Sequence, residues 1–185
     1  MTVTDRAVLI APGASATRDH SSLVAVEAAL APEGVPVERI DLPSRKATAV
    51  VVGMVRDAAA ALAVGTGLAP DRLVLGGRSF GGRMCSMAVA EGLPALGLVL
   101  VSYPLHLPGR PEKSRTEHLP LITVPCLFVS GTRDSFGTPA ELEAATATIA
   151  GPVTHRWLEG GDHGLRGRDK AVAALVREWV LGLPG

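Results

Sequence analysis

A serine, an aspartate and a histidine follow one another along this chain in an order that suits nucleophilic catalysis. Ser79 lies in the pentapeptide GRSFG (77–81), which fits the G-x-S-x-G pattern of a nucleophile elbow. A serine hydroxyl is a weak nucleophile, so it needs a neighbouring base to take its proton. Asp134, in GTRDSFG, and His163, in GGDHGL, come later in the chain. The set therefore predicts a catalytic triad for acyl transfer.

Each member of the predicted triad would have its own role. Ser79 would attack a carbonyl carbon, and His163 would accept the proton and later return it to the leaving group. Asp134 would fix the imidazole tautomer and stabilise the imidazolium. The alternatives are a Gly-Ser turn, a turn aspartate and a loop histidine without chemistry. Asp162 competes for the acid role, but it adjoins His163, and neighbouring residues seldom orient each other's side chains.

The oxyanion formed during acyl transfer needs backbone donors close to the serine. The N–H of Phe80, directly after the nucleophile, is one expected donor. The second would come from the loop after the first strand, where Gly13 or Ala14 can supply it. Pro12 cannot, because proline has no N–H.

The elements that must position these residues alternate along the chain. The expected strands are 7–12, 35–42, 72–77, 96–104, 125–131 and 154–160. The expected helices are 20–31, 47–64, 80–91, one that begins at Thr138-Pro139 and one that begins near 168. Near-continuous Val, Leu and Ile runs predict an α/β fold with a mostly parallel six-stranded sheet and helices on both faces. Ser79, Asp134 and His163 each follow a different strand, so they would meet where such sheets bind ligands.

Candidates for contact with a substrate lie around this meeting point. The segment 103–125 is long, irregular and rich in proline and charge, which is typical of a loop that lines a cleft. Arg78 and Arg83 flank the serine, and they would either bind an anionic group or anchor nearby loops. The residues expected to contact the substrate are Ser15, Arg78, Tyr103 and His106.

Composition limits the class of protein. Hydrophobic residues make up 47% of the 185 residues, which predicts a single globular domain over 1–185. Eighteen basic residues balance eighteen acidic ones, so charge favours neither a nucleic acid nor an anionic membrane as partner. The apolar stretch 47–64 carries Arg56 and Asp57 at its centre, which favours a core helix over a membrane span. Cys85 and Cys126 are expected to be buried hydrophobes.

Localisation, oligomeric state and cofactors follow from the same features. The N-terminal apolar run is too short for a secretory signal, so we expect a cytoplasmic protein that is a monomer or homodimer. No histidine has the spacing of a metal site, and no metal or organic cofactor is implied.

Four segments together resemble one family of α/β hydrolases: GGRSFGGRM, YPLHLPGRPEKSRTEHLP, FVSGTRDSFGTPAEL and GGDHGL. The family contains small cap-less proteins, among them bacterial dienelactone-hydrolase-like proteins, the eukaryotic testis-expressed protein 30 and the hydrolase-like part of a subunit of a histone-acetyltransferase complex. The resemblance covers essentially the whole chain. It implies a six-stranded α/β-hydrolase fold without a cap domain and without the usual first antiparallel hairpin. It also implies that Ser79, Asp134 and His163 occupy the family's triad positions.

The resemblance implies a serine hydrolase of the carboxylesterase kind that acts on a small ester or thioester. The alternatives are a catalytically silent interaction module and a dienelactone- or peptidase-type hydrolase. The sequence departs from the family's usual His-Gly-Ala-Gly after the first strand, because it has Pro12-Gly13-Ala14-Ser15 there. The backbone donors of the expected oxyanion hole are kept, and a loop histidine is lost.

Overall fold

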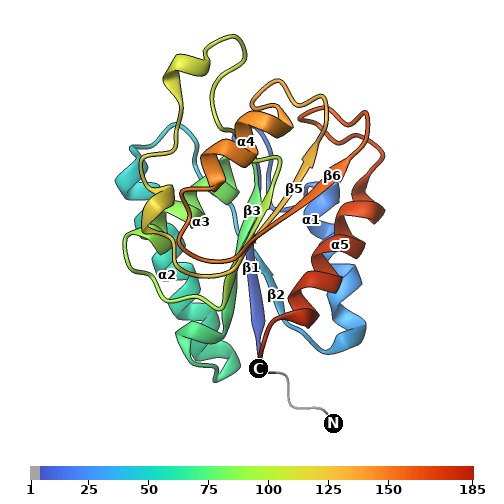
Figure 1. Cartoon of the computed structure of the whole chain (residues 1–185). Coiled ribbons are helices and arrows are strands. Elements are labelled where there is room, and N and C mark those ends of the chain that lie inside the picture. Colours follow the sequence, from blue (N-terminus) through green and yellow to red (C-terminus); the bar gives the residue numbers. More distant parts are fainter. Residues whose placement is uncertain (1–4) are drawn as a thin grey trace.

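Six parallel strands form the central sheet of the computed structural model, which describes residues 5–185 (Figure 1). Residues 1–4 of the expected domain and of the N-terminal run lie outside the described residues. The strands are β1 (Ala7–Ala11), β2 (Val37–Arg39), β3 (Leu73–Arg78), β4 (Gly97–Val101), β5 (Cys126–Gly131) and β6 (Val153–Leu158). Their order in the sheet is β2-β1-β3-β4-β5-β6, and every adjacent pair is parallel.

Helices cover both faces of the sheet. Figure 1 shows α1 (Ser21–Leu30) and α5 (Asp169–Gly182) side by side on one face. On the other face lie α2 (Thr48–Thr66) and α3 (Phe80–Ala90), with α4 (Pro139–Thr146) near the carboxyl end of the strands. The predicted α/β fold is therefore confirmed, and within residues 5–185 no cap domain is inserted between these elements.

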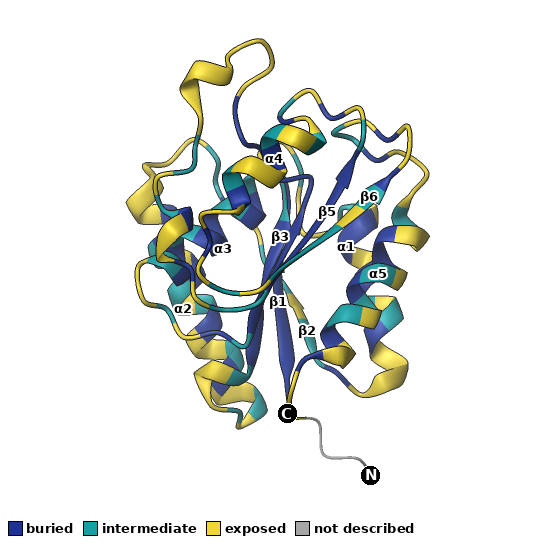
Figure 2. Ribbon diagram, in the orientation of Figure 1, coloured by how far each residue is buried: buried dark blue, intermediate teal, exposed yellow. Residues whose placement is uncertain are grey.

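The core consists of two apolar layers, one on each side of the sheet. Alternate strand residues point to opposite faces, so Leu9 and Leu75 pack with α2 and α3, whereas Val8 and Val74 pack with α1 and α5. Figure 2 shows the four inner strands, β1, β3, β4 and β5, almost wholly buried between exposed outer helix faces, whereas the edge strands β2 and β6 are partly exposed. Burial on both faces explains the continuous apolar runs in the sequence.

Three strands, β2, β4 and β6, end two or three residues earlier than expected. β4 ends at Val101 rather than 104, because Ser102 has a φ of 49° and leaves the extended region. β2 spans only 37–39, after Pro36, which has no N–H for a strand ladder. β6 ends at Leu158 because Gly160, with a φ of 69°, turns the chain.

One helix of the described residues, α2, is long and apolar enough to cross a membrane by length and composition alone. One of its faces, with Val51, Val52 and Val55, is buried against the sheet. Cys85 and Cys126 are free and buried, as expected, and burial raises the pKa of each thiol to about 12.

Candidate active site

Ser79 lies at a sharp turn between β3 and α3. It is the N-cap of α3, with a φ of 48° and a ψ of −114°, a conformation that costs a non-glycine residue about 1–3 kcal/mol. The turn presses against the end of β1. A Cβ at Gly77 would lie 2.1 Å from the Ala11 carbonyl oxygen, and one at Gly81 would lie 2.4 Å from the same atom. Both glycines are therefore required for this close approach.

A chain of hydrogen bonds connects the three residues of the predicted triad. The Ser79 Oγ lies 2.9 Å from Nε2 of His163. The other ring nitrogen, Nδ1, lies 2.9 and 2.8 Å from the two carboxylate oxygens of Asp134. Asp134 is only 4% exposed and also accepts a hydrogen bond of 2.8 Å from the backbone N–H of Phe136. A buried carboxylate at Nδ1 selects the tautomer whose Nε2 can accept the serine proton.

Two further residues hold His163 in place. The Phe136 ring stacks on the imidazole with centroids 3.9 Å apart. Arg78 Nη2 donates a hydrogen bond of 2.6 Å to the His163 carbonyl, and burial lowers the pKa of Arg78. Arg78 thus anchors the histidine loop, the second of its two expected roles, although it also lines the cleft. The sequence holds no local signal for either contact, because both depend on the fold.

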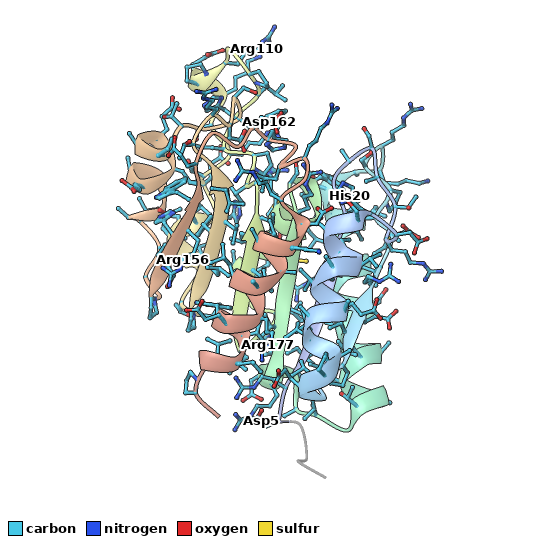
Figure 3. The ribbon with its side chains drawn as sticks, turned by 90° about the vertical axis from the view of Figure 1, so that its right-hand side faces the viewer. Asp5, His20, Arg110, Arg156, Asp162 and Arg177 are labelled. Atoms are coloured by element: carbon cyan, nitrogen blue, oxygen red, sulfur yellow. The ribbon has the colours of Figure 1, made fainter. Side chains whose placement is uncertain are left out.

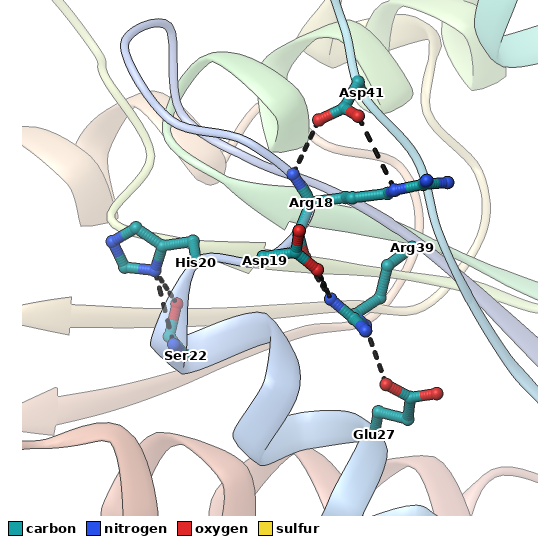
Figure 4. A network of polar contacts seen from close by, with 7 residues as sticks. All are labelled: Arg18, Asp19, His20, Ser22, Glu27, Arg39 and Asp41. Atoms are coloured by element: carbon teal, nitrogen blue, oxygen red, sulfur yellow. Dashed lines mark hydrogen bonds and ion pairs between the residues drawn. The ribbon is translucent and has the colours of Figure 1, made fainter.

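His20 and Asp162 shape the surroundings of the site. His20 is the N-cap of α1 and accepts a hydrogen bond of 3.3 Å from the Ser22 N–H, as Figure 4 shows. Its other ring nitrogen lies 3.2 Å from Arg78. Asp162 Oδ1 accepts a hydrogen bond of 3.0 Å from the Leu165 N–H and therefore closes a turn. In Figure 3 both labelled residues lie toward the end of the molecule opposite Asp5.

The loop after β1 approaches the serine from the other side. A Cβ at Gly13 would lie 3.7 Å from the Ser79 Cβ. The Ser44 hydroxyl donates a hydrogen bond of 2.7 Å to the Ala14 carbonyl, which orients this loop. Among the described residues, no hydrogen bond uses the backbone N–H of Gly13, Ala14 or Phe80. These amides are therefore available to a developing oxyanion.

Ser79, His163 and the loop after β1 border one cleft of about 670 Å³, whereas Asp134 does not line it. Its lining comprises Gly13, Ala14, Ser15, Ala16, His20, Ser44, Arg78, Ser79, Phe80, Arg83, Pro104, Leu107, Arg115, Phe136 and His163. Of the residues expected to contact a substrate, the cleft includes Ser15 and Arg78. The segment 103–125, which was expected to line a cleft, contributes Pro104, Leu107 and Arg115 to it, although these residues were not singled out. Ser44 was missed, because it comes from a loop without a recognisable motif.

Tyr103 and His106 do not line this cleft, which corrects the expectation that they contact the substrate. Tyr103 is 2% exposed, packs edge-on against Phe128 and donates a hydrogen bond of 3.2 Å to the Arg115 carbonyl. Burial raises the pKa of Tyr103 to about 12. His106 borders a separate hollow, where its Nε2 lies 3.6 Å from Glu141. The positive φ of the preceding Ser102 redirects the chain before both residues.

A second histidine, His118, is half-buried. His118 Nε2 lies 2.8 Å from the Ser86 hydroxyl and 3.4 Å from the Tyr103 hydroxyl. Burial, and secondarily the charge of Arg83, lowers the pKa of His118 to about 4. His118 is therefore neutral at pH 7.

Comparison with known proteins agrees with this architecture. A family model described as an alpha/beta hydrolase domain matches residues 4–179. The structure of Est1E from Butyrivibrio proteoclasticus matches with a TM-score of 0.79, at 17% identity over 96% of this chain and 88% of that chain. A dienelactone hydrolase from Anabaena variabilis matches with a TM-score of 0.77, at 20% identity over 98% and 88%. DcsB, solved with a substrate analogue, matches with a TM-score of 0.80, at 16% identity over 97% and 91%.

Proposed function

The chain belongs to the α/β hydrolase domain family, and from that premise we propose that it is a serine hydrolase. It cleaves small esters or thioesters through an acyl-enzyme intermediate. The observation that carries the proposal is the continuous hydrogen-bonded chain from Ser79 Oγ through His163 to the buried Asp134. A loop serine or histidine without chemistry would need no such alignment.

The geometry supports a two-step mechanism. Ser79 Oγ attacks the carbonyl carbon while its proton moves to Nε2 of His163, and Asp134 stabilises the imidazolium. Collapse of the tetrahedral intermediate breaks the bond to the leaving group, which takes the proton from His163. A water molecule then attacks the acyl-enzyme, with His163 as base, and Ser79 recovers its proton as the acid is released.

The oxyanion of each tetrahedral intermediate is bound by the Phe80 N–H together with that of Gly13 or Ala14. The support for this assignment is that these amides have no partner among the described residues. The positive end of the α3 dipole, at Phe80, adds to the stabilisation. Loss of one such donor costs about 100–1,000-fold in kcat in other hydrolases.

The cleft favours short acyl groups. Within residues 5–185 no inserted domain covers the cleft, so no protein surface encloses the end of a longer acyl chain. Rates measured on p-nitrophenyl esters of increasing acyl length should therefore fall beyond about four to six carbons. Equal rates on long-chain esters would contradict this preference.

Labelling with a fluorophosphonate probe tests the proposal directly. The native protein and the Ser86→Ala variant should be labelled, whereas Ser79→Ala should not. Ser86 is the matched control, because it is a second serine of the same helix that also contacts a histidine. Folded native protein that resists labelling would reject the nucleophile and favour the alternative of a silent interaction module.

A further inference from the structure

The cleft contains three arginines, and the guanidinium groups of two of them have no partner among residues 5–185. Arg78 is bound to the His163 carbonyl, as described above. Arg83 and Arg115 also line the cleft, but within residues 5–185 neither guanidinium makes a hydrogen bond or an ion pair. No aspartate or glutamate of the described chain lines the cleft with them. The cleft therefore carries uncompensated positive charge beside the nucleophile.

Arg83 is the more unusual of the two. Its Nε is buried and has no hydrogen-bond partner among the described residues. Burial lowers the pKa of Arg83; the charge of Arg115 acts in the same direction, and Tyr103 and Glu117 oppose it. A half-buried guanidinium that lacks an anion is costly, and a carboxylate bound in the cleft would satisfy the donors of its two Nη groups.

The position of Arg83 sets how far such an anion lies from the reacting carbon. The Arg83 N–H donates a hydrogen bond of 3.0 Å to the Ser79 carbonyl, so the two residues are one helical turn apart. Residues four apart share a helix face, with Cβ atoms about 5–6 Å apart. An anion held by Arg83 would therefore be only a few bonds from the carbonyl that Ser79 attacks.

Arg115 is held toward the same cleft from the segment 103–125. Its N–H donates a hydrogen bond of 2.8 Å to the Leu105 carbonyl, and its own carbonyl accepts the Tyr103 hydroxyl at 3.2 Å. These bonds fix the backbone of Arg115, and its guanidinium has no partner in the part of the chain that the structure describes. Such pre-organisation lowers the entropy cost of binding an anion.

On the basis of the proposed function, we propose that Arg83 and Arg115 bind a carboxylate of the substrate. The preferred substrates are then short esters or thioesters that carry a carboxylate a few bonds from the scissile carbonyl. Half-esters of small dicarboxylic acids belong to this class. The arginine pair makes the enzyme discriminate between a charged acyl or leaving group and its neutral counterpart.

Two matched ester pairs test this specificity. The acyl-side pair is the p-nitrophenyl monoester of glutaric acid and p-nitrophenyl valerate. The leaving-group pair is butyryloxyacetate and propyl butyrate, whose hydrolysis is measured by the release of acid. In at least one pair we expect the native enzyme to have the higher kcat/KM on the charged ester. That preference should fall about tenfold or more in Arg83→Met, as expected for loss of a charge-assisted hydrogen bond.

Arg110→Met is the control. Arg110 is an exposed arginine of the same segment and lies outside the cleft, at the tip labelled in Figure 3. This variant makes the same change in net charge and should keep the native preference within twofold. Arg115→Met, on the segment 103–125 rather than on α3, provides a second test if Arg83→Met does not fold. An unchanged preference in folded Arg83→Met or Arg115→Met would overturn the proposal, as would a native enzyme without preference in either pair.

A binding experiment separates this inference from the proposed function. Glutarate is titrated into Ser79→Ala and into Ser79→Ala/Arg83→Met, which requires no turnover. We expect the second variant to bind glutarate at least tenfold more weakly. If the native protein cleaves no ester and is not labelled, the serine hydrolase is rejected, but this difference would still support the anion site. Equal affinities in the two variants would reject the anion site even if esters are cleaved.

Discussion

Among the described residues, two serine hydroxyls lie within hydrogen-bond distance of the Nε2 atom of a histidine, and the two distances are almost the same. Ser79 and His163 are 2.9 Å apart, and Ser86 and His118 are 2.8 Å apart, in each case from Oγ to Nε2. Both serines belong to the same helical segment, one as the N-cap of α3 and the other within it. Distance alone therefore does not distinguish a nucleophile from a structural contact.

The two pairs differ in the groups around them. His163 has the Asp134 carboxylate at Nδ1, and its serine opens onto the cleft. His118 has no carboxylate partner among the described residues, and Ser86 is fully buried. Burial lowers the pKa of His118 to about 4 although the charges of Glu117 and Glu91 oppose it, so a proton taken from Ser86 would create an imidazolium that touches no carboxylate of the described chain. Access and a paired acid are what make the first pair suitable for catalysis.

The largest effect is expected from a substitution that removes the serine of the first pair and leaves the second pair intact. Ser79→Ala should lower kcat on p-nitrophenyl acetate by about 100,000-fold or more, because no group replaces the nucleophile. Ser86→Ala should retain activity within about threefold. Steady-state kinetics of the two variants checks this contrast. Equal losses would mean that Ser79 has no special role.

Removal of the acid should make the first pair resemble the second. Asp134→Asn should lower kcat by about 1,000- to 10,000-fold, because the amide no longer fixes the required tautomer or stabilises the imidazolium. Asp162→Asn changes the neighbouring carboxylate, which only closes a turn, and should have an effect below about tenfold. If the two variants ranked in the opposite order, Asp162 would be the acid.

The second pair should affect stability in acid rather than activity. The pKa of His118 is about 4 in the folded protein and about 6.5 when unfolded, so the unfolded chain binds the proton first as the pH falls. The stabilisation present above pH 6.5 is therefore lost between pH 6.5 and pH 4. We expect a loss of about 1–2 kcal/mol between pH 7.5 and pH 5 after allowance for solvent screening. Urea unfolding of the native protein and of His118→Asn at the two pH values measures this loss. The variant should lack the part of the pH dependence that comes from His118.

The smallest expected effect concerns the hydroxyl next to the second pair. Tyr103→Phe removes the hydrogen bond to the Arg115 carbonyl and the contact with His118 while keeping the ring against Phe128. The free energy of unfolding should fall by about 1 kcal/mol. Thermal or urea denaturation measures the change. A loss above about 3 kcal/mol would indicate that the hydroxyl organises the whole segment.

The sequence predicted the sheet and the order of the candidate triad because both depend on local patterns. Apolar runs specify buried strands, and Ser79, Asp134 and His163 each follow such a run. The placement of Tyr103 was not predictable, because it depends on the left-handed conformation of Ser102, a serine that no local pattern marks as a turn. Contacts between distant segments, such as that of Arg78 with the His163 carbonyl, likewise cannot be predicted from the spacing of residues along the sequence.

The bond between Arg78 and the His163 carbonyl has a consequence for the second half of the proposed reaction. Once Ser79 Oγ is acylated, its proton is gone and the serine no longer tethers the imidazole. Arg78 immediately precedes Ser79, and its hydrogen bond of 2.6 Å does not involve the reacting atoms. The histidine loop therefore stays attached to the strand end that carries the acyl group. The imidazole of His163 can therefore keep its resting position in the acyl-enzyme until a water molecule attacks.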